Sequence, residues 1–286
     1  TLQQSSAASD VYKRQGRLLC TRRTRLSHRG EAVYVGDRVR VEAIDPGQGR
    51  AVVAEVEPRH SFLTRPPVAN VSLVAVVLAV EQPSFDPDQA SRFLLTAERT
   101  GLEVILLLTK TDLFSAAALE RLVTRLKGWG YDPLALSSAA GTGIDALRQR
   151  LAGAQLSALC GPSGVGKSSL LNQLRPDLQL RTAAVSGRLQ RGRHTTRHVE
   201  LFPLGPSARV ADTPGFNRPD LPDDPQELGV LFPELRQQLD PWPCRFRDCL
   251  HRGEPGCGVS TDWERYSLYK AALIEQSSLS RPSRGG

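Results

Sequence analysis

The chain has 286 residues, which is enough for two or three small domains with a sizeable core. Lysine and arginine total 37 and aspartate and glutamate total 30, and the net charge of +7 suits a polyanionic partner as well as a merely solvated basic surface. No stretch reaches the roughly 18 to 20 apolar residues of a membrane span, and no signal peptide is recognisable. We therefore expect a cytoplasmic protein without a membrane role.

The beginning of the chain changes character at residue 16. Residues 1–15 lack periodicity, and the chain has no methionine, so we expect a disordered tail or a cloning or assembly scar there. Short alternating segments between turn signals follow, at 32–35, 38–43 and 51–57. They predict a small β-barrel domain over residues 16–67, and Arg65-Pro66-Pro67 predicts a stiff linker at its end.

From residue 68 the pattern is an alternation of buried strands and amphipathic helices. Residues 71–80 are almost continuously apolar, which is typical of a strand buried on both faces. Alternating elements of this kind predict a parallel α/β sheet, and we assign residues 68–218 to this second domain. The further strands are expected at 104–108, 134–137, 156–160 and 208–211, and the helices at 87–100, 115–129 and 144–151.

A phosphate-binding loop follows the strand at 156–160. The segment fits G-x-x-x-x-G-K-[ST] between a strand and a helix, and it reads Gly161-Pro162-Ser163-Gly164-Val165-Gly166-Lys167-Ser168-Ser169. Backbone N–H groups of such a loop surround phosphate oxygens, and the helix adds its positive end. We expect Lys167 to reach the β- and γ-phosphates and Ser168 to ligate Mg²⁺. The loop alone predicts a nucleotide, either ATP or GTP.

Two motifs ahead of the loop favour guanine. Thr109-Lys110-Thr111-Asp112 is a variant of the Asn-Lys-x-Asp sequence of GTPases, and Asp112 can accept two hydrogen bonds that adenine cannot offer. The Thr109 hydroxyl replaces only part of an asparagine amide. Ser137-Ser138-Ala139 is similar to the loop whose backbone contacts guanine O6. Each motif alone is also compatible with an ordinary loop, so the prediction rests on the two together.

Two candidate switches follow the phosphate loop. Asp212-Thr213-Pro214-Gly215 fits D-x-x-G, where we expect Asp212 to hold Mg²⁺ through a water and the Gly215 N–H to sense the γ-phosphate. His194-Thr195-Thr196 lies in an arginine-rich segment, in which a threonine can close on Mg²⁺.

Phe216 stands where many GTPases carry a water-orienting glutamine, so another residue must position the attacking water. His194 is the candidate, because a neutral imidazole can orient a water near pH 7. Stabilising the switch loop or touching RNA is the equally open alternative for His194. The expected catalytic set is Lys167, His194, Thr195 and Thr196.

The order of these motifs is unusual. The guanine motifs precede the phosphate loop, whereas ordinary GTPases begin with that loop. This order predicts a circular permutation, in which D-x-x-G leads directly into the C-terminal segment.

The C-terminal segment contains a metal-ligand pattern. Cys244, Cys249, His251 and Cys257 fit C-x4-C-x-H-x5-C, and three thiolates with one imidazole form a closed tetrahedral set. The pattern predicts one structural Zn²⁺ in a domain over residues 219–286, which includes a helix at 262–276; free or buried thiols are the alternative.

Together these motifs resemble the ribosome small-subunit-dependent GTPase family, called RsgA or YjeQ. The resemblance also includes Val35-Gly-Asp-Arg-Val39, the segment at 65–70, and Arg265-Tyr266. It implies an N-terminal OB-fold, a permuted GTPase domain and a zinc domain. It further implies late maturation of the small ribosomal subunit, binding to its rRNA, and hydrolysis of GTP to GDP; we expect a monomer. The basic cluster at 12–29 is the candidate RNA contact.

Two rival readings remain at this point. A P-loop ATPase or kinase with a zinc module would lack the guanine motifs, and comparing GTP with ATP binding distinguishes it. A non-catalytic binding module would carry a degenerate nucleotide site. The sequence argues against this alternative, because it retains Lys167, Ser168 and Asp212.

Overall fold

The structure is a computed structural model, and it describes residues 18–23, 32–180, 199–213, 222 and 224–279. The chain divides into two compact units, residues 1–71 and 72–286.

The first unit is built from short strands. β1 (Leu19–Arg22), β3 (Arg50–Val56) and β2 (Val39–Asp45) form a sheet in that order, with β1 parallel and β2 antiparallel to β3. β4 (Phe62–Thr64) pairs with β5 (Pro67–Ala69) as a hairpin, so the predicted stiff linker is wrong: residues 65–67 form a turn and the start of a strand. The predicted strand at 32–35 is reduced to one bridge between Val35 and Val68. An OB-fold barrel stays a prediction.

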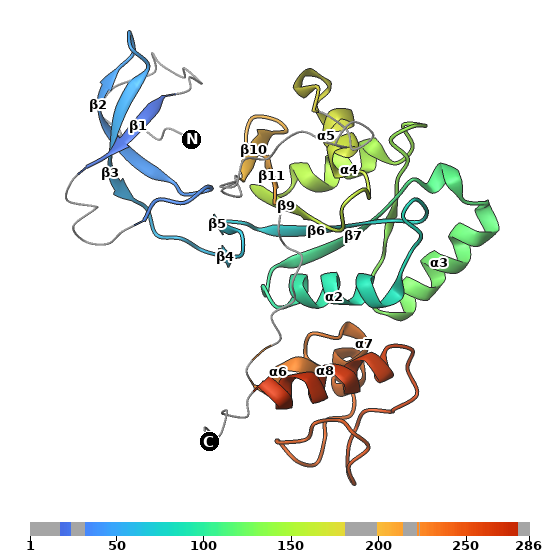
Figure 1. Ribbon diagram of the computed structural model, residues 1–286. Helices are drawn as coiled ribbons and strands as arrows, with labels where there is room; N and C mark the ends of the chain where they lie inside the picture. Colours follow the sequence, from blue (N-terminus) through green and yellow to red (C-terminus); the bar gives the residue numbers. More distant parts are fainter. Residues whose placement is uncertain (1–17, 24–31, 181–198, 214–221, 223, 280–286) are drawn as a thin grey trace, which may run out of the picture. The chain divides into compact units, whose positions relative to one another are not determined.

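The second unit contains a six-stranded sheet in the order β10-β11-β9-β6-β7-β8 (Figure 1). The predicted parallel α/β sheet is confirmed for five of these strands, whereas β10 is antiparallel to β11 and was not predicted. All seven residues of β6 are buried, as the apolar run indicates. The strands are β6 (Leu73–Ala79), β7 (Glu103–Thr109), β8 (Leu134–Ala135), β9 (Leu156–Cys160), β10 (Glu200–Pro203) and β11 (Arg209–Asp212).

Helices cover both faces of this sheet. α4 (Ile144–Ala152) and α5 (Lys167–Leu174) lie on one face, and α2 (Pro87–Glu98) and α3 (Ala116–Gly128) on the other (Figure 1). The leucines of α4 and α5 pack with the strands into one buried cluster. α2 and α3 begin at Asp86 and Ser115, whose side chains accept hydrogen bonds from the first turn of each helix.

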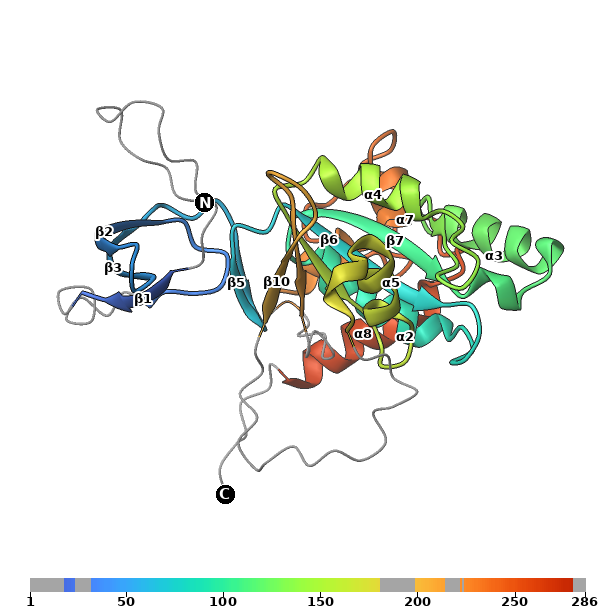
Figure 2. The same cartoon turned by 90° about the horizontal axis from the view of Figure 1, so that it is seen from above.

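The C-terminal helices form a smaller cluster. They are α6 (Pro225–Gly229), α7 (Pro233–Leu239) and α8 (Tyr266–Leu279), whose apolar side chains pack around the fully buried Phe232 and Tyr269. Both views show α8 beside α2 (Figures 1 and 2), and Leu95 of α2 belongs to the same cluster. α8 starts four residues later than predicted. Within the described residues, no helix combines the length and hydropathy that crossing a bilayer demands.

Candidate nucleotide-binding site and metal centre

The phosphate-binding loop lies between β9 and α5, as the sequence predicts. Gly161 has φ +146°, and a Cβ there would lie 2.1 Å from the Val77 carbonyl oxygen of the neighbouring β6. Only glycine permits this approach, which brings the loop against the centre of the sheet. Gly164 and Gly166 also have positive φ, and the buried Val165 side chain anchors the loop beneath them.

Two charged groups lie at this loop, Lys167 at the start of α5 and Asp212 at the end of β11. The Lys167 Nζ donates to the carbonyl oxygens of Gly161 and Pro162, both at 2.8 Å. Burial lowers the pKa of Lys167, whereas the Asp212 carboxylate opposes that shift. Burial likewise raises the pKa of Asp212, and Lys167 opposes it.

The Asp212 carboxylate is suited to a cation. Its Oδ1 is buried and, among the described residues, accepts no hydrogen bond. Asp212 ends β11 and pairs in register with Leu159 of β9, so the carboxylate lies near the start of the phosphate loop. An acceptor-only group that is buried without a donor fits a Mg²⁺ ion with its bound waters.

The Thr109 hydroxyl contacts the backbone of two neighbouring segments. Thr109 ends β7, is 2 % exposed, and its Oγ1 lies 2.5 Å from the Val165 carbonyl oxygen and 3.1 Å from that of Leu78. A hydroxyl has one proton, so it donates to one of these oxygens at a time. Thr109 therefore ties the guanine loop to the phosphate loop through the chain's own backbone.

The next residues of the guanine loop present Lys110 and Asp112. Lys110 has φ +58°, and its Nζ donates to the Gln82 carbonyl oxygen. Ser137 Oγ donates to Asp112 Oδ1 at 2.5 Å and accepts from the Ala140 N–H at 3.0 Å. Ser137 thus fixes the rotation of the Asp112 carboxylate, which is the group expected to read guanine.

One cavity of about 470 Å³ brings these segments together. Its walls come from the guanine loop, from the turn after β8 and from α5, which are far apart in the sequence. Sequence reasoning did not select Leu113, Asn172 or Gln173; the last two follow Ser169 by three and four residues and therefore share its helix face. The lining residues are Thr109, Lys110, Asp112, Leu113, Ser138, Ala139, Gly166, Ser169, Asn172 and Gln173.

Some predicted site residues lie outside the described part of the chain. These are His194, Thr195, Thr196, Gly215 and Phe216. Ser163 and Ser168 lie in the phosphate loop and at the start of α5 respectively, as expected.

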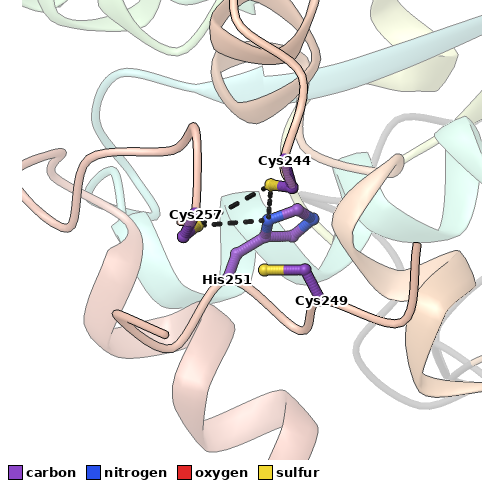
Figure 3. A group of neighbouring side chains, drawn as sticks. All are labelled: Cys244, Cys249, His251 and Cys257. Carbon is purple, nitrogen blue, oxygen red and sulfur yellow. Dashed lines mark hydrogen bonds between the residues drawn. The ribbon is translucent and has the colours of Figure 1, made fainter. Parts of the chain in front are cut away.

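The predicted metal ligands converge in the C-terminal segment. The ligand atoms of Cys244, Cys249, His251 and Cys257 all lie within 4.8 Å of one another, and Figure 3 shows the three thiols around the imidazole. The Cys244 Sγ is 3.8 Å from the Cys257 Sγ and 3.4 Å from the His251 Nδ1. A tetrahedral zinc site has edges of roughly 3.3–3.8 Å, so these groups fit the ion.

The surrounding chain holds this cluster in place. Gly229 approaches His251 closely: a Cβ there would lie 3.2 Å from the ring Cδ2. Tyr269 of α8 donates to the Leu250 carbonyl oxygen at 2.8 Å. Burial raises the pKa of the Cys249 and Cys257 thiols, so a bound cation is needed to keep them as thiolates at neutral pH.

A P-loop between β9 and α5, preceded in the chain by the guanine-loop motif, defines the class of circularly permuted GTPases. The RsgA GTPase family profile matches residues 56–222. The chain belongs to the RsgA GTPase family.

Several known proteins are similar to the chain over nearly its full length. A relative from Synechococcus sp. (strain CC9605), named small ribosomal subunit biogenesis GTPase RsgA, is 97% identical over 95% of this chain and 89% of its own length. The crystal structure of YjeQ from Thermotoga maritima matches with a TM-score of 0.76 at 32% identity, covering 93% of this chain and 91% of that one. YloQ, described as a circularly permuted GTPase, matches with 0.71 at 30% identity, covering 93% and 88%.

Proposed function

We propose that this protein is a GTPase that binds the small ribosomal subunit and assists its late maturation, hydrolysing GTP to GDP and phosphate in a ribosome-stimulated way. The cavity that joins Asp112 to the phosphate loop is the observation that carries the GTPase part. The name of the 97% identical relative supports the ribosomal part.

In this proposal each end of the nucleotide has its own residues. Asp112 accepts from the guanine edge, and the backbone around Ser138 and Ala139 contributes donors to guanine O6. Lys167 would exchange the carbonyl oxygens that it contacts for the β- and γ-phosphates, and Ser168 and Asp212 would hold Mg²⁺. The bound Mg²⁺ would supply charge neutralisation at the phosphates.

The remaining switch residues act at the γ-phosphate. Gly215 would sense it through its N–H, and Thr195 or Thr196 would contribute a hydroxyl to the Mg²⁺ site. His194 positions the attacking water, because Phe216 has no hydrogen-bonding group.

The N-terminal residues 16–67 form the RNA-binding domain in this proposal, with an OB-fold. Exposed Arg22 at the end of β1 and Arg23 beside it belong to the basic cluster of the sequence. Lysine and arginine side chains bind phosphate groups with little sequence preference. The rRNA of the small subunit is the proposed ligand.

Residues 219–286 form a domain stabilised by one Zn²⁺, with a structural role because all four positions are filled by protein ligands. We place the protein in the cytoplasm, since its proposed partner is assembled there. We also propose that it acts as a monomer.

Co-sedimentation with purified small ribosomal subunits tests the proposal. The protein should pellet with the subunits in the presence of a non-hydrolysable GTP analogue and less so with GDP, and the subunits should raise kcat for GTP. Large subunits serve as the control. Equal binding to both subunits, or an unchanged kcat, would contradict the ribosomal assignment.

A further inference from the structure

One side chain of α5 bridges the cavity wall to the turn after β8. Gln173 Nε2 donates to the Ser138 carbonyl oxygen at 2.8 Å, and both residues line the cavity. Gln173 lies about one helical turn beyond Ser169, near the end of α5 that is distant from the phosphate loop. The bond therefore links the phosphate-loop helix to the second guanine motif.

The turn that receives this bond has several hydrogen bonds of its own at its base, whereas its tip depends on Gln173. At the base, the Ser137 N–H donates to the Thr142 carbonyl oxygen at 3.1 Å, and Ser137 Oγ contacts both Asp112 and the Ala140 N–H. At the tip lies the peptide between Ser138 and Ala139. Within the described residues, the Gln173 amide is the one hydrogen-bond partner of this peptide, and the Ala139 N–H has no acceptor.

A peptide unit is planar and trans, so its C=O and its N–H have fixed opposite directions. A donor that holds the Ser138 carbonyl oxygen therefore also sets the direction of the Ala139 N–H. An exposed loop peptide without such a contact can rotate, and every rotation away from the binding geometry lowers the affinity for a ligand that needs this N–H.

We propose that Gln173 is a positioning residue for purine recognition, which holds the Ser138–Ala139 peptide so that the site selects bases with an oxygen at the six position. The inference rests on the proposed guanine-nucleotide site. It adds a residue from outside the two guanine motifs, which sequence reasoning did not select.

The test compares GDP, IDP and 6-thioguanosine diphosphate by isothermal titration on the full chain, with ADP added as the control for the underlying site. GDP carries the O6 acceptor and both donors for Asp112, IDP keeps O6 but lacks the 2-amino group, and 6-thioguanosine diphosphate replaces O6 by a weakly accepting sulfur. The variant Gln173→Met keeps the side-chain length and removes the donor. Gln149→Met is the matched control, because Gln149 is an exposed glutamine of α4 that does not line the cavity.

We expect Gln173→Met to weaken GDP and IDP binding by the same factor, about three- to tenfold, the range of one hydrogen bond. Binding of the 6-thio nucleotide should weaken less, so the preference for GDP over it should shrink. KM for GTP should rise while kcat at saturation changes less than about twofold. Gln149→Met should leave all of these values unchanged.

Equal weakening of GDP and the 6-thio nucleotide, or unchanged GDP affinity in Gln173→Met, would overturn the role of Gln173. Failure of the underlying site looks different, because the wild-type chain would then bind ADP as tightly as GDP. A wild type that prefers GDP over ADP, combined with a Gln173→Met variant whose preference for GDP over the 6-thio nucleotide is unchanged, rejects this inference and leaves the proposed function intact.

Discussion

Thr109 lines the candidate nucleotide cavity and joins two of the loops that border it. Its hydroxyl is buried and bonded to the backbone of the phosphate loop and of β6, so it fixes the distance between the two loops. In the proposed function the reading of guanine falls to Asp112, whose carboxylate accepts a hydrogen bond from Ser137 at 2.5 Å.

Asp112 should carry the guanine selectivity. Asp112→Asn replaces an acceptor pair by one acceptor and one donor, which suits xanthine and not guanine. Two hydrogen bonds to a charged group are worth at least about 3 kcal/mol together, so GDP affinity should fall about a hundredfold or more. Titrations with GDP and XDP measure this, with the exposed Asp132→Asn as control. Retained GDP selectivity would show that another group reads the base.

His194 should act in hydrolysis and not in binding. His194→Ala should lower the subunit-stimulated kcat at least about a hundredfold, the scale of a lost acid–base or water-orienting group. GDP affinity should stay within about twofold, because the phosphate loop and the guanine loop are unchanged. His60→Ala, an exposed histidine in the first unit, is the control. Full stimulated activity in His194→Ala would transfer the role to the ribosome.

At the scale of elements, the C-terminal helices are joined to α2 and α3 by a buried polar and aromatic contact. Arg265 is 3 % exposed, pairs with both oxygens of Glu234, and stacks over Trp129, with its Cζ 4.7 Å from the ring centroid. The Trp129 Nε1 donates to Glu264 at 2.9 Å. Because α3 follows the segment 109–113 directly, the helix that contacts Arg265 through Trp129 is also the one that leads out of the predicted guanine loop.

Breaking this ion pair should be costly. Glu234→Ala leaves the Arg265 guanidinium buried without its counter-charge, and we expect a loss of about 3–5 kcal/mol in unfolding free energy. Urea unfolding followed by tryptophan fluorescence measures it. Asp132→Ala, which breaks the exposed pair with Lys127, should change the value by less than about 1 kcal/mol. Similar costs for the two variants would mean that the buried pair is not a main stabilising contact.

The metal centre should be a folding element of the same region. Metal analysis of the purified protein should find about one zinc per chain, because a closed four-ligand site holds one ion. Cys249→Ala should lose this zinc and expose the C-terminal segment to proteolysis, since metal binding supplies folding free energy. Cys20→Ala, an exposed cysteine of the first unit, should change neither. A folded preparation of wild type without metal would refute the assignment.

At the scale of the whole molecule, the chain divides into two compact units, and the proposed function assigns RNA binding to the first and the nucleotide to the second. The permuted order places the chain segment that leads to the C-terminal helices directly after the D-x-x-G sequence that begins at Asp212. This connectivity gives a route from the nucleotide state to the rest of the molecule.

RNA binding should depend on salt through the basic N-terminal cluster. Replacing Arg22, Arg23 and Arg25 by glutamine should weaken binding to small-subunit rRNA and lower the slope of log K against log salt by about two, since each phosphate contact on a single strand contributes roughly 0.7. Fluorescence anisotropy over a salt series measures this. The same charge change at Arg121, Lys127 and Arg150 of the second unit is the control. An unchanged slope would place the RNA elsewhere.

The sequence by itself determined the chemistry of this protein. The phosphate loop, the Cys₃His ligands and the buried strands are local patterns whose meaning depends on spacing alone, and the structure forms the loop, the cluster and five parallel strands where the patterns lie. The antiparallel β10 was missed, because an edge strand of four residues carries too short a periodic signal.

Only the tertiary structure decided which distant residues share the site. Gln173 and Asn172 look like ordinary polar residues of a helix, and they become cavity walls because β7, β8 and β9 end at the same edge of the sheet. The same holds for Thr109, whose partner Val165 is 56 residues away. Contacts of this range depend on the packing of the whole unit, and no local pattern of residue types encodes them.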